Sequence, residues 1–131
     1  MSRKLVTLIA VIFVVTSACG GGDDGSGACS ANPAPIEVGP AEADRGNNVY
    51  NSICVACHGS DGEGIRGNGK PLVDNEFIAS LPDGALVNFI IQGRDAGHDD
   101  NTTGIDMPPC GGSDELTEQD LVDVVAYLRG L

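Results

Sequence analysis

The sequence of 131 residues has no tryptophan, three phenylalanines and two tyrosines, and seven basic against nineteen acidic residues. So few basic side chains argue against nucleic acid as a partner, because phosphate binding needs a basic patch. No stretch alternates convincingly as a β-strand, and the periodic segments are helical. The scarcity of aromatic side chains predicts a thin core, and a domain this small often needs a staple or a cofactor to be stable.

A long apolar run is also missing. The run from Leu5 to Val15 is shorter than the roughly 20 residues that span a bilayer. Two basic residues precede it and small residues lead from it to Cys19, so it resembles a lipoprotein export signal, although leucine is more usual than Thr16. We expect residues 1–18 to be removed and Cys19 to carry lipid; secretion with cleavage nearby is the alternative. Either route places the protein on the periplasmic or cell-surface side.

The segment 19–40 is rich in glycine, aspartate, serine, alanine and proline, which cannot bury a core. We expect it to be a flexible tether for a domain at 41–131. Without Arg3 and Lys4 the chain keeps five basic and nineteen acidic residues, a net charge of −14. Anionic lipid would repel this domain, so the anchor has to provide membrane attachment. The charge favours a partner with a basic docking face, or serves only solubility.

The most informative pattern is the pentapeptide CVACH, from Cys54 to His58. Residues three apart share a face of a helical turn, so both cysteines can bond the vinyl groups on one side of a porphyrin. His58 then lies under the iron, and the single copy of the pattern predicts one covalent haem c. A redox dithiol would need a βαβ context, and a zinc site would need a second ligand pair, which His98 alone does not supply.

A second axial ligand is expected from Met107, because Met1 leaves with the export signal. Met107 precedes Pro108 and Pro109, which stiffen the segment behind it. A thioether opposite the histidine would favour ferrous iron and raise the reduction potential. The alternative ligand is His98, whose polar surroundings predict a solvated loop. The alternative role of Met107 is to fill a gap in a surface turn.

Three helices follow from apolar periodicity. The first starts near Ala41 and runs into the CVACH motif, with Gly46 where we expect another helix to cross closely. The second covers Pro82–Gln92, and Arg94 suits its end. The last begins with a capping box at Thr117 and carries an apolar stripe.

Taken together, these residues resemble a small class I c-type cytochrome over residues 41–131. The motifs that carry the resemblance are CVACHGSDGEG, LPDGALVNFIIQGR, MPP and LTEQDLVDVVAYLRGL. The resemblance implies an all-α fold of three to four helices around one haem, with the terminal helices crossing. It also implies that the carbonyl of Pro71 accepts a hydrogen bond from the imidazole of His58, which would orient the ring and tune the iron.

Cys29 and Cys110 are left over once the lipid and haem cysteines are assigned. Spare thiols tend to pair in an oxidising compartment, so we expect a disulfide that clamps the tether beside the methionine segment. Two free thiols are the alternative, because a sequence alone does not fix connectivity.

The sequence therefore predicts a membrane-tethered monohaem carrier that exchanges single electrons with a redox donor and acceptor. No residue has to act as acid, base or nucleophile. The alternatives are a catalytic haem protein, such as a small peroxidase or sulfur-compound oxidase, and an electron-accepting subunit fixed in a redox complex.

Overall fold

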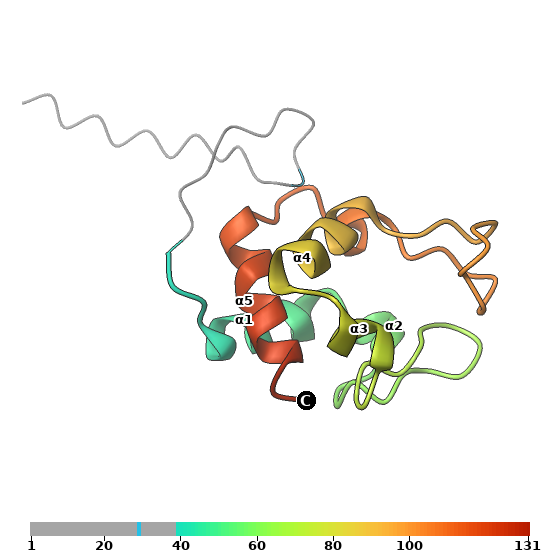
Figure 1. Cartoon of the computed structure of the whole chain (residues 1–131), viewed down its shortest axis with the longest axis horizontal. Helices are drawn as coiled ribbons and strands as arrows, with labels where there is room; N and C mark the ends of the chain where they lie inside the picture. The colour runs from blue at the N-terminus through green and yellow to red at the C-terminus, as the bar shows by residue number, and fades with distance from the viewer. Residues whose placement is uncertain (1–28, 30–38) are drawn as a thin grey trace, which may run out of the picture.

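The computed structural model describes Cys29 and residues 39–131. This part of the chain contains no β-strand, only one isolated antiparallel bridge between Arg94 and Met107. It forms five α-helices and one 3-10 turn (Figure 1): α1 Ala43–Ser52, α2 Val55–His58, α3 Glu76–Ser80, α4 Asp83–Gln92, η1 Pro109–Gly112 and α5 Glu118–Leu128. The expected all-α fold is confirmed. The expected signal peptide and nearly all of the tether lie outside the described residues.

Two of the five helices are short and raise the number above the three to four expected. The first predicted helix ends at Ser52, and the haem motif forms its own turn, α2, after a break at Ile53. The second short helix, α3, is capped by Asn75, whose side chain accepts a hydrogen bond from the N–H of Ile78 at 3.2 Å. None of the helices in the described part is long and apolar enough to cross a membrane.

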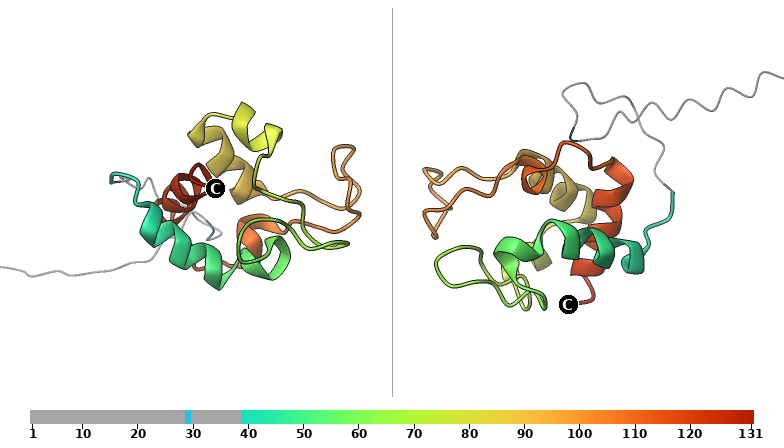
Figure 2. Two further views of the ribbon diagram at one scale, coloured as in Figure 1. Left: turned by 90° about the horizontal axis from the view of Figure 1, so that it is seen from below. Right: turned by 180° about the vertical axis from the view of Figure 1, so that it is seen from behind.

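The frame of the domain is the crossing of α1 and α5, which Figures 1 and 2 show from three sides. Gly46 is buried at the crossing, and a Cβ there would overlap the backbone carbonyl of Asp123. The predicted close crossing at this glycine is therefore confirmed. One turn further along, the rings of Tyr50 and Tyr127 pack with centroids 5.2 Å apart.

A buried carboxylate locks this crossing. The side chain of Asp123 is fully buried and accepts hydrogen bonds from the backbone of Glu42 at 2.8 Å and from Gln119 at 2.9 Å. It also pairs with the guanidinium of Arg45. Burial alone would raise the pKa of Asp123, but the hydrogen bonds from Arg45, Glu42 and Gln119 outweigh it and hold that pKa below its usual value.

The last helix connects the frame to the other helices. Its predicted capping box is confirmed, since the Thr117 hydroxyl accepts from Asp120 N–H and the Asp120 carboxylate accepts from Thr117 N–H. At its far end the guanidinium of Arg129 donates hydrogen bonds to the carboxylate of Asp83 at 3.0 Å and to the carbonyl of Ile78 at 2.6 Å. These contacts hold α3 and α4 over α5. The apolar core lies between them and contains Tyr50, Leu86, Val87, Ile90, Leu116, Leu121, Val124, Val125 and Leu128.

Candidate functional site

One cavity of about 510 Å³ opens between α2, α4 and the loop that joins α4 to η1. This volume is in the range of sites that hold small molecules and cofactors. Its walls are mostly apolar, and the apolar lining includes Ile53, Leu72, Ile78, Leu86, Phe89, Ile90, Leu121, Val124 and Leu128. The long loops 59–75 and 95–106 project from the same end of the molecule (Figures 1 and 2).

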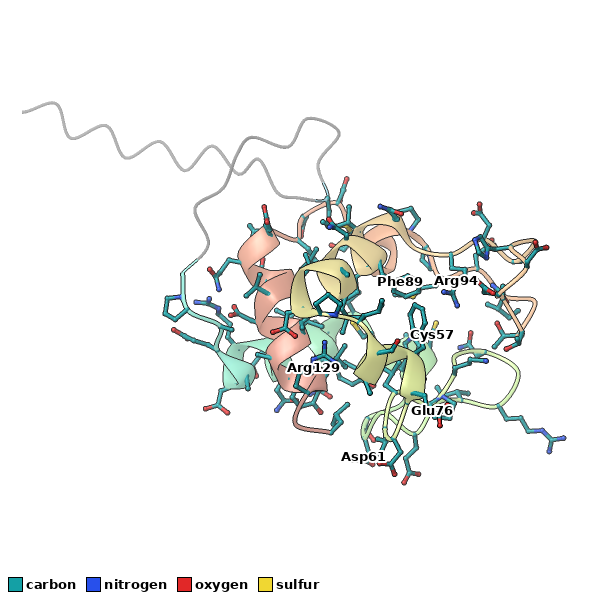
Figure 3. All side chains as sticks on the ribbon, in the orientation of Figure 1. Cys57, Asp61, Glu76, Phe89, Arg94 and Arg129 are labelled. Atoms are coloured by element: carbon teal, nitrogen blue, oxygen red, sulfur yellow. A yellow bond between two sulfur atoms is a disulfide. The ribbon has the colours of Figure 1, made fainter. Side chains whose placement is uncertain are left out.

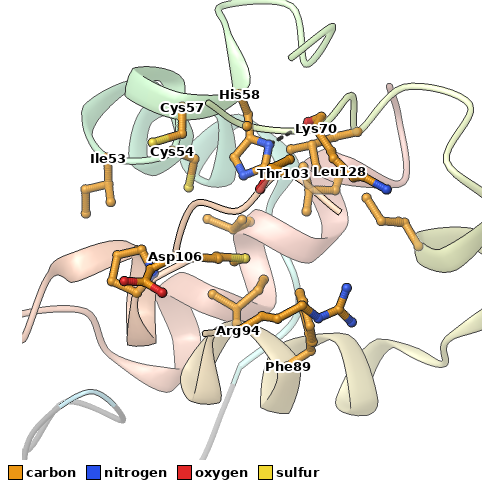
Figure 4. Close-up of a pocket in the computed structure, with 18 of the residues that line it drawn as sticks. Ile53, Cys54, Cys57, His58, Lys70, Phe89, Arg94, Thr103, Asp106 and Leu128 are labelled. Carbon is orange, nitrogen blue, oxygen red and sulfur yellow. Dashed lines mark hydrogen bonds between the residues drawn. The ribbon is translucent and has the colours of Figure 1, made fainter. Parts of the chain in front are cut away.

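The two cysteines of the CVACH motif lie on one wall of this cavity (Figure 4). Cys57 N–H and His58 N–H both donate to the carbonyl of Cys54, so the motif forms the helical turn that its spacing predicts. Neither Cys54 nor Cys57 is in a disulfide. Burial raises the pKa of the Cys54 thiol to about 11. A neutral thiol of this kind is a poor redox nucleophile, which argues against the dithiol oxidoreductase.

The imidazole of His58 also lines the cavity, and its orientation is fixed. Its Nδ1 donates a hydrogen bond of 2.8 Å to the carbonyl of Lys70, which leaves Nε2 as the ring nitrogen available to a metal. The resemblance pointed to the carbonyl of Pro71 instead, and that assignment is wrong by one residue. The Pro71 carbonyl already accepts from the side chain of Asn75 at 2.7 Å, whereas the Lys70 carbonyl, in the amide that precedes the proline, faces the histidine.

Contacts from both sides hold the haem motif, and sequence reasoning missed two of them. Asn68 donates from its side chain to the carbonyl of Ala56 at 3.1 Å. The hydroxyl of Tyr50 donates to the carbonyl of Gly59 at 2.6 Å, and burial, as the largest cause, raises the pKa of this tyrosine to about 12. Nothing in the sequence pairs either side chain with the motif.

Met107 lines the same cavity from the side of α4. Its backbone pairs with Arg94, which Figure 4 shows across the cavity from Cys54, Cys57 and His58. The structure thus brings the four predicted haem residues to one cavity. His98, the rival ligand, does not line it; the side chain is about half exposed, and its Nδ1 accepts from the N–H of Asp100 at 3.1 Å.

Arg94 is a lining residue whose position no sequence pattern revealed. Its guanidinium lies 4.9 Å from the ring centre of Phe77 and 4.7 Å from that of Phe89, so it contacts two aromatic faces. Figure 3 shows Arg94 and Phe89 on the side of the domain where Cys57 lies. The sequence placed Arg94 only at a helix end. The contact needs Phe77 from α3, and the packing of α3 on α4 is a tertiary feature.

The remaining predicted residues lie at the edge of the site or outside it. Cys110 is buried, lines the cavity and forms a disulfide with Cys29, with a Cα–Cα distance of 5.9 Å. Cys19, the predicted lipid attachment point, lies outside the described residues.

The donor set fits a covalently bound haem. Two unpaired thiols on one helical turn, a ring nitrogen next to them and a thioether on the other side surround an apolar cavity. Within residues 39–131 and at Cys29, no three His, Cys, Asp or Glu side chains gather where they could hold a metal ion. A zinc site made from these residues alone would need such a group.

Comparison with known proteins agrees with this donor set. Residues 41–128 match the family described as cytochrome C oxidase, cbb3-type, subunit III. Cytochrome c-555 of Prosthecochloris aestuarii is 32% identical over 86 residues, which cover 64% of this chain and 82% of that protein. The cbb3-type cytochrome c oxidase subunit FixP of Bradyrhizobium diazoefficiens is 37% identical over 54 residues, which cover 40% of this chain but 19% of FixP. No solved structure matches the chain significantly.

Proposed function

The chain belongs to the cytochrome c oxidase, cbb3-type, subunit III family, and on this premise we propose that it carries single electrons on one haem c. When bound, the haem supplies an iron that alternates between ferric and ferrous states. The observation that carries the proposal is that Cys54, Cys57, His58 and Met107 all line one largely apolar cavity.

Each of these residues has a distinct role in the proposal. Cys54 and Cys57 attach the haem by thioether bonds, and His58 ligates the iron through Nε2 while Lys70 holds its ring. Met107 ligates from the other side. A thioether in this position favours the ferrous state and raises the reduction potential.

Electron transfer of this kind needs no catalytic acid, base or nucleophile. A catalytic haem protein, the alternative raised by the sequence, needs an open or displaceable iron position and a polar group beside it. Displacement of Met107 from the iron should be difficult, because its backbone is hydrogen-bonded to Arg94 and two prolines follow it. Slow binding of cyanide or carbon monoxide at neutral pH supports the carrier, whereas rapid binding supports the enzyme.

Attachment to a membrane is a further part of the proposal. Residues 1–18 act as a lipoprotein signal, Cys19 carries lipid, and the segment 19–40 tethers the domain at 41–131 outside the cytoplasm. Two features of the sequence support this attachment. The first 40 residues have the composition of an export signal followed by a tether, and the strongly acidic domain has no electrostatic attraction of its own to anionic lipid. The same acidity favours donor and acceptor proteins with a basic docking face.

The similarity to FixP favours a second candidate, an electron-accepting subunit that stays in a redox complex. The two candidates share the haem site and differ in the lifetime of the assembly. Isolation of the native protein from mild-detergent extracts separates them: a carrier elutes alone, and a fixed subunit elutes with constant stoichiometric partners.

A redox titration followed by optical spectra tests the haem and its ligands together. We expect one reversible one-electron transition, a covalent haem that acidified acetone does not extract, and the long-wavelength band of a methionine–iron(III) bond. Colourless mature protein, or pigment that acidified acetone extracts, would overturn the proposal. A haem protein without the methionine band would retain the carrier but remove Met107 as its ligand.

A further inference from the structure

The segment that carries Met107 is firmly held on its amino-terminal side. Two backbone hydrogen bonds of 2.7 and 2.9 Å join Met107 to Arg94. The end of α4 approaches closely as well, because a Cβ on Gly93 would overlap the carbonyl of Met107 and lie 2.7 Å from the nitrogen of Pro109, two residues further on. Met107 is therefore fixed to α4, and α4 also approaches the start of the segment that follows it.

The segment 108–115, directly after Met107, packs against α4 through η1, but its backbone has no comparable hydrogen bonds to other described residues. Pro108 and Pro109 have no N–H to donate. In the part of the chain that the structure describes, every backbone hydrogen bond of this segment joins two of its own residues. Within the described residues, hydrogen bonds of its backbone therefore do not connect the segment to the rest of the domain.

A covalent bond does connect it. Cys110 has 3% of its surface exposed and a φ of 53°, a left-handed conformation that is unfavourable for a residue with a Cβ. Its disulfide leads to Cys29, and the N–H of Cys29 donates to the carbonyl of Leu116 at 3.3 Å. Cys29 thus holds the segment at Cys110 and again just before α5 begins.

We propose that the Cys29–Cys110 disulfide is a positioning element for Met107. It keeps the segment after the ligand in place, so that the thioether stays on the iron. This inference rests on the proposed ligation by Met107. A disulfide that served only as a general staple would stabilise the whole domain by restricting the unfolded chain, with no separate effect at the methionine.

Two variants of the haem-loaded full chain separate these roles. Cys29→Ala breaks the link and leaves the Cys110 side chain in its buried place. Val125→Ala is the matched control, because Val125 is buried in α5 but does not line the cavity, so its loss lowers global stability without touching the methionine segment. If Cys29→Ala does not yield folded protein, wild-type protein is reduced with a phosphine and its iron is then reoxidised.

Three measurements report on Met107 itself: the rate of cyanide binding to the ferric protein, the temperature at which the methionine–iron(III) band is lost, and hydrogen exchange of the Met107 amide. In Cys29→Ala we expect cyanide binding and Met107 exchange to be at least about tenfold faster, with the band lost well below global unfolding. In Val125→Ala we expect changes within about twofold until the whole domain unfolds.

Equal effects in the two variants, once scaled to their global stability, would overturn the inference, as would unchanged cyanide binding and exchange in Cys29→Ala. A wild-type protein without the methionine band would instead disprove the ligation on which the inference rests. Whether or not the methionine band is present, the exchange rate of the Met107 amide still shows whether the disulfide fixes the backbone of Met107.

Discussion

The two walls of the cavity that we propose for the haem are built in different ways. On the α2 wall, the partners of the motif are close in sequence: His58 bonds Lys70, and Ala56 accepts from Asn68. On the methionine wall, Met107 is held by the end of α4, and Cys110 is bonded to a residue 81 positions away. The α2 wall can therefore form from contacts between residues near in sequence, whereas the methionine wall depends on contacts between distant parts of the folded chain.

This difference predicts how the site responds to damage. A perturbation of the tertiary structure should displace Met107 before it displaces His58, because the α2 wall keeps its local hydrogen bonds. Four changes test this difference, in order of decreasing expected effect. The first acts on both walls and the second on the methionine wall. The third acts on the crossing of α1 and α5 behind both walls, and the fourth acts on a single contact.

Loss of the covalent links to haem should have the largest effect, because both walls would face the haem in the protein that we propose. In Cys54→Ala/Cys57→Ala we expect a poorly folded protein, since a thin core loses its central apolar group. Calorimetry should show no cooperative unfolding transition. Val55→Ala, on the same helical turn, is the control and should retain the transition. A cooperative, native-like transition in the double variant would contradict this prediction.

Removal of the thioether should affect one wall alone. In Met107→Leu, which keeps similar volume, we expect the methionine–iron(III) band to vanish and the reduction potential to fall by on the order of a tenth of the ~0.8 V range that axial ligands span. The haem should remain covalently attached to the α2 wall. His98→Ala is the control, and a shift of similar size in that variant would point to histidine ligation instead.

Asp123 tests the frame behind both walls. Its pKa is lowered in the folded protein, so its contribution to stability is present above the unfolded value of about 3.9 and is lost as the pH falls through the folded pKa. We expect Asp123→Asn to lower Tm by roughly 5 °C or more at pH 7. That deficit should shrink below about pH 4. Asp44→Asn, exposed on α1, should change Tm little at either pH.

The smallest effect is expected from Arg94→Lys, which keeps the charge but removes the flat contact with Phe77 and Phe89. We expect a loss of about 0.5–1 kcal/mol in the free energy of unfolding, with the methionine band lost at a slightly lower temperature. Arg66→Lys, the same change in the exposed loop on the other wall, serves as control. Identical results for the two variants would show that the aromatic contact contributes nothing.

Sequence reasoning succeeded where the structure is local. The haem turn, the capping box at Thr117 and the glycine at the helix crossing each depend on a few neighbouring residues or on one conspicuous residue type. These features could be predicted from the sequence because helical spacing and capping chemistry act over three or four residues.

Contacts that depend on the tertiary structure could not be predicted in the same way. The acceptor for His58 is the carbonyl of Lys70 and not that of Pro71, which instead accepts from Asn75, the residue that caps α3. The contact of Arg94 with Phe77 likewise requires two helices to be packed first. Spacing along the chain specifies neither relationship.

If Cys19 carries lipid, as we propose, the disulfide also limits how far the domain can move from a bilayer. With the lipid that we propose on Cys19, ten residues lead to Cys29, a leash of at most ~36 Å when fully extended. Without the bridge and the hydrogen bond from Cys29 to Leu116, the next tie among the described residues is the hydrogen bond between Gly39 and Gln119, twenty residues from the lipid and at most ~72 Å away. In the lipid-anchored form that we propose, closing one sulfur bond therefore halves the longest reach between the lipid and the domain.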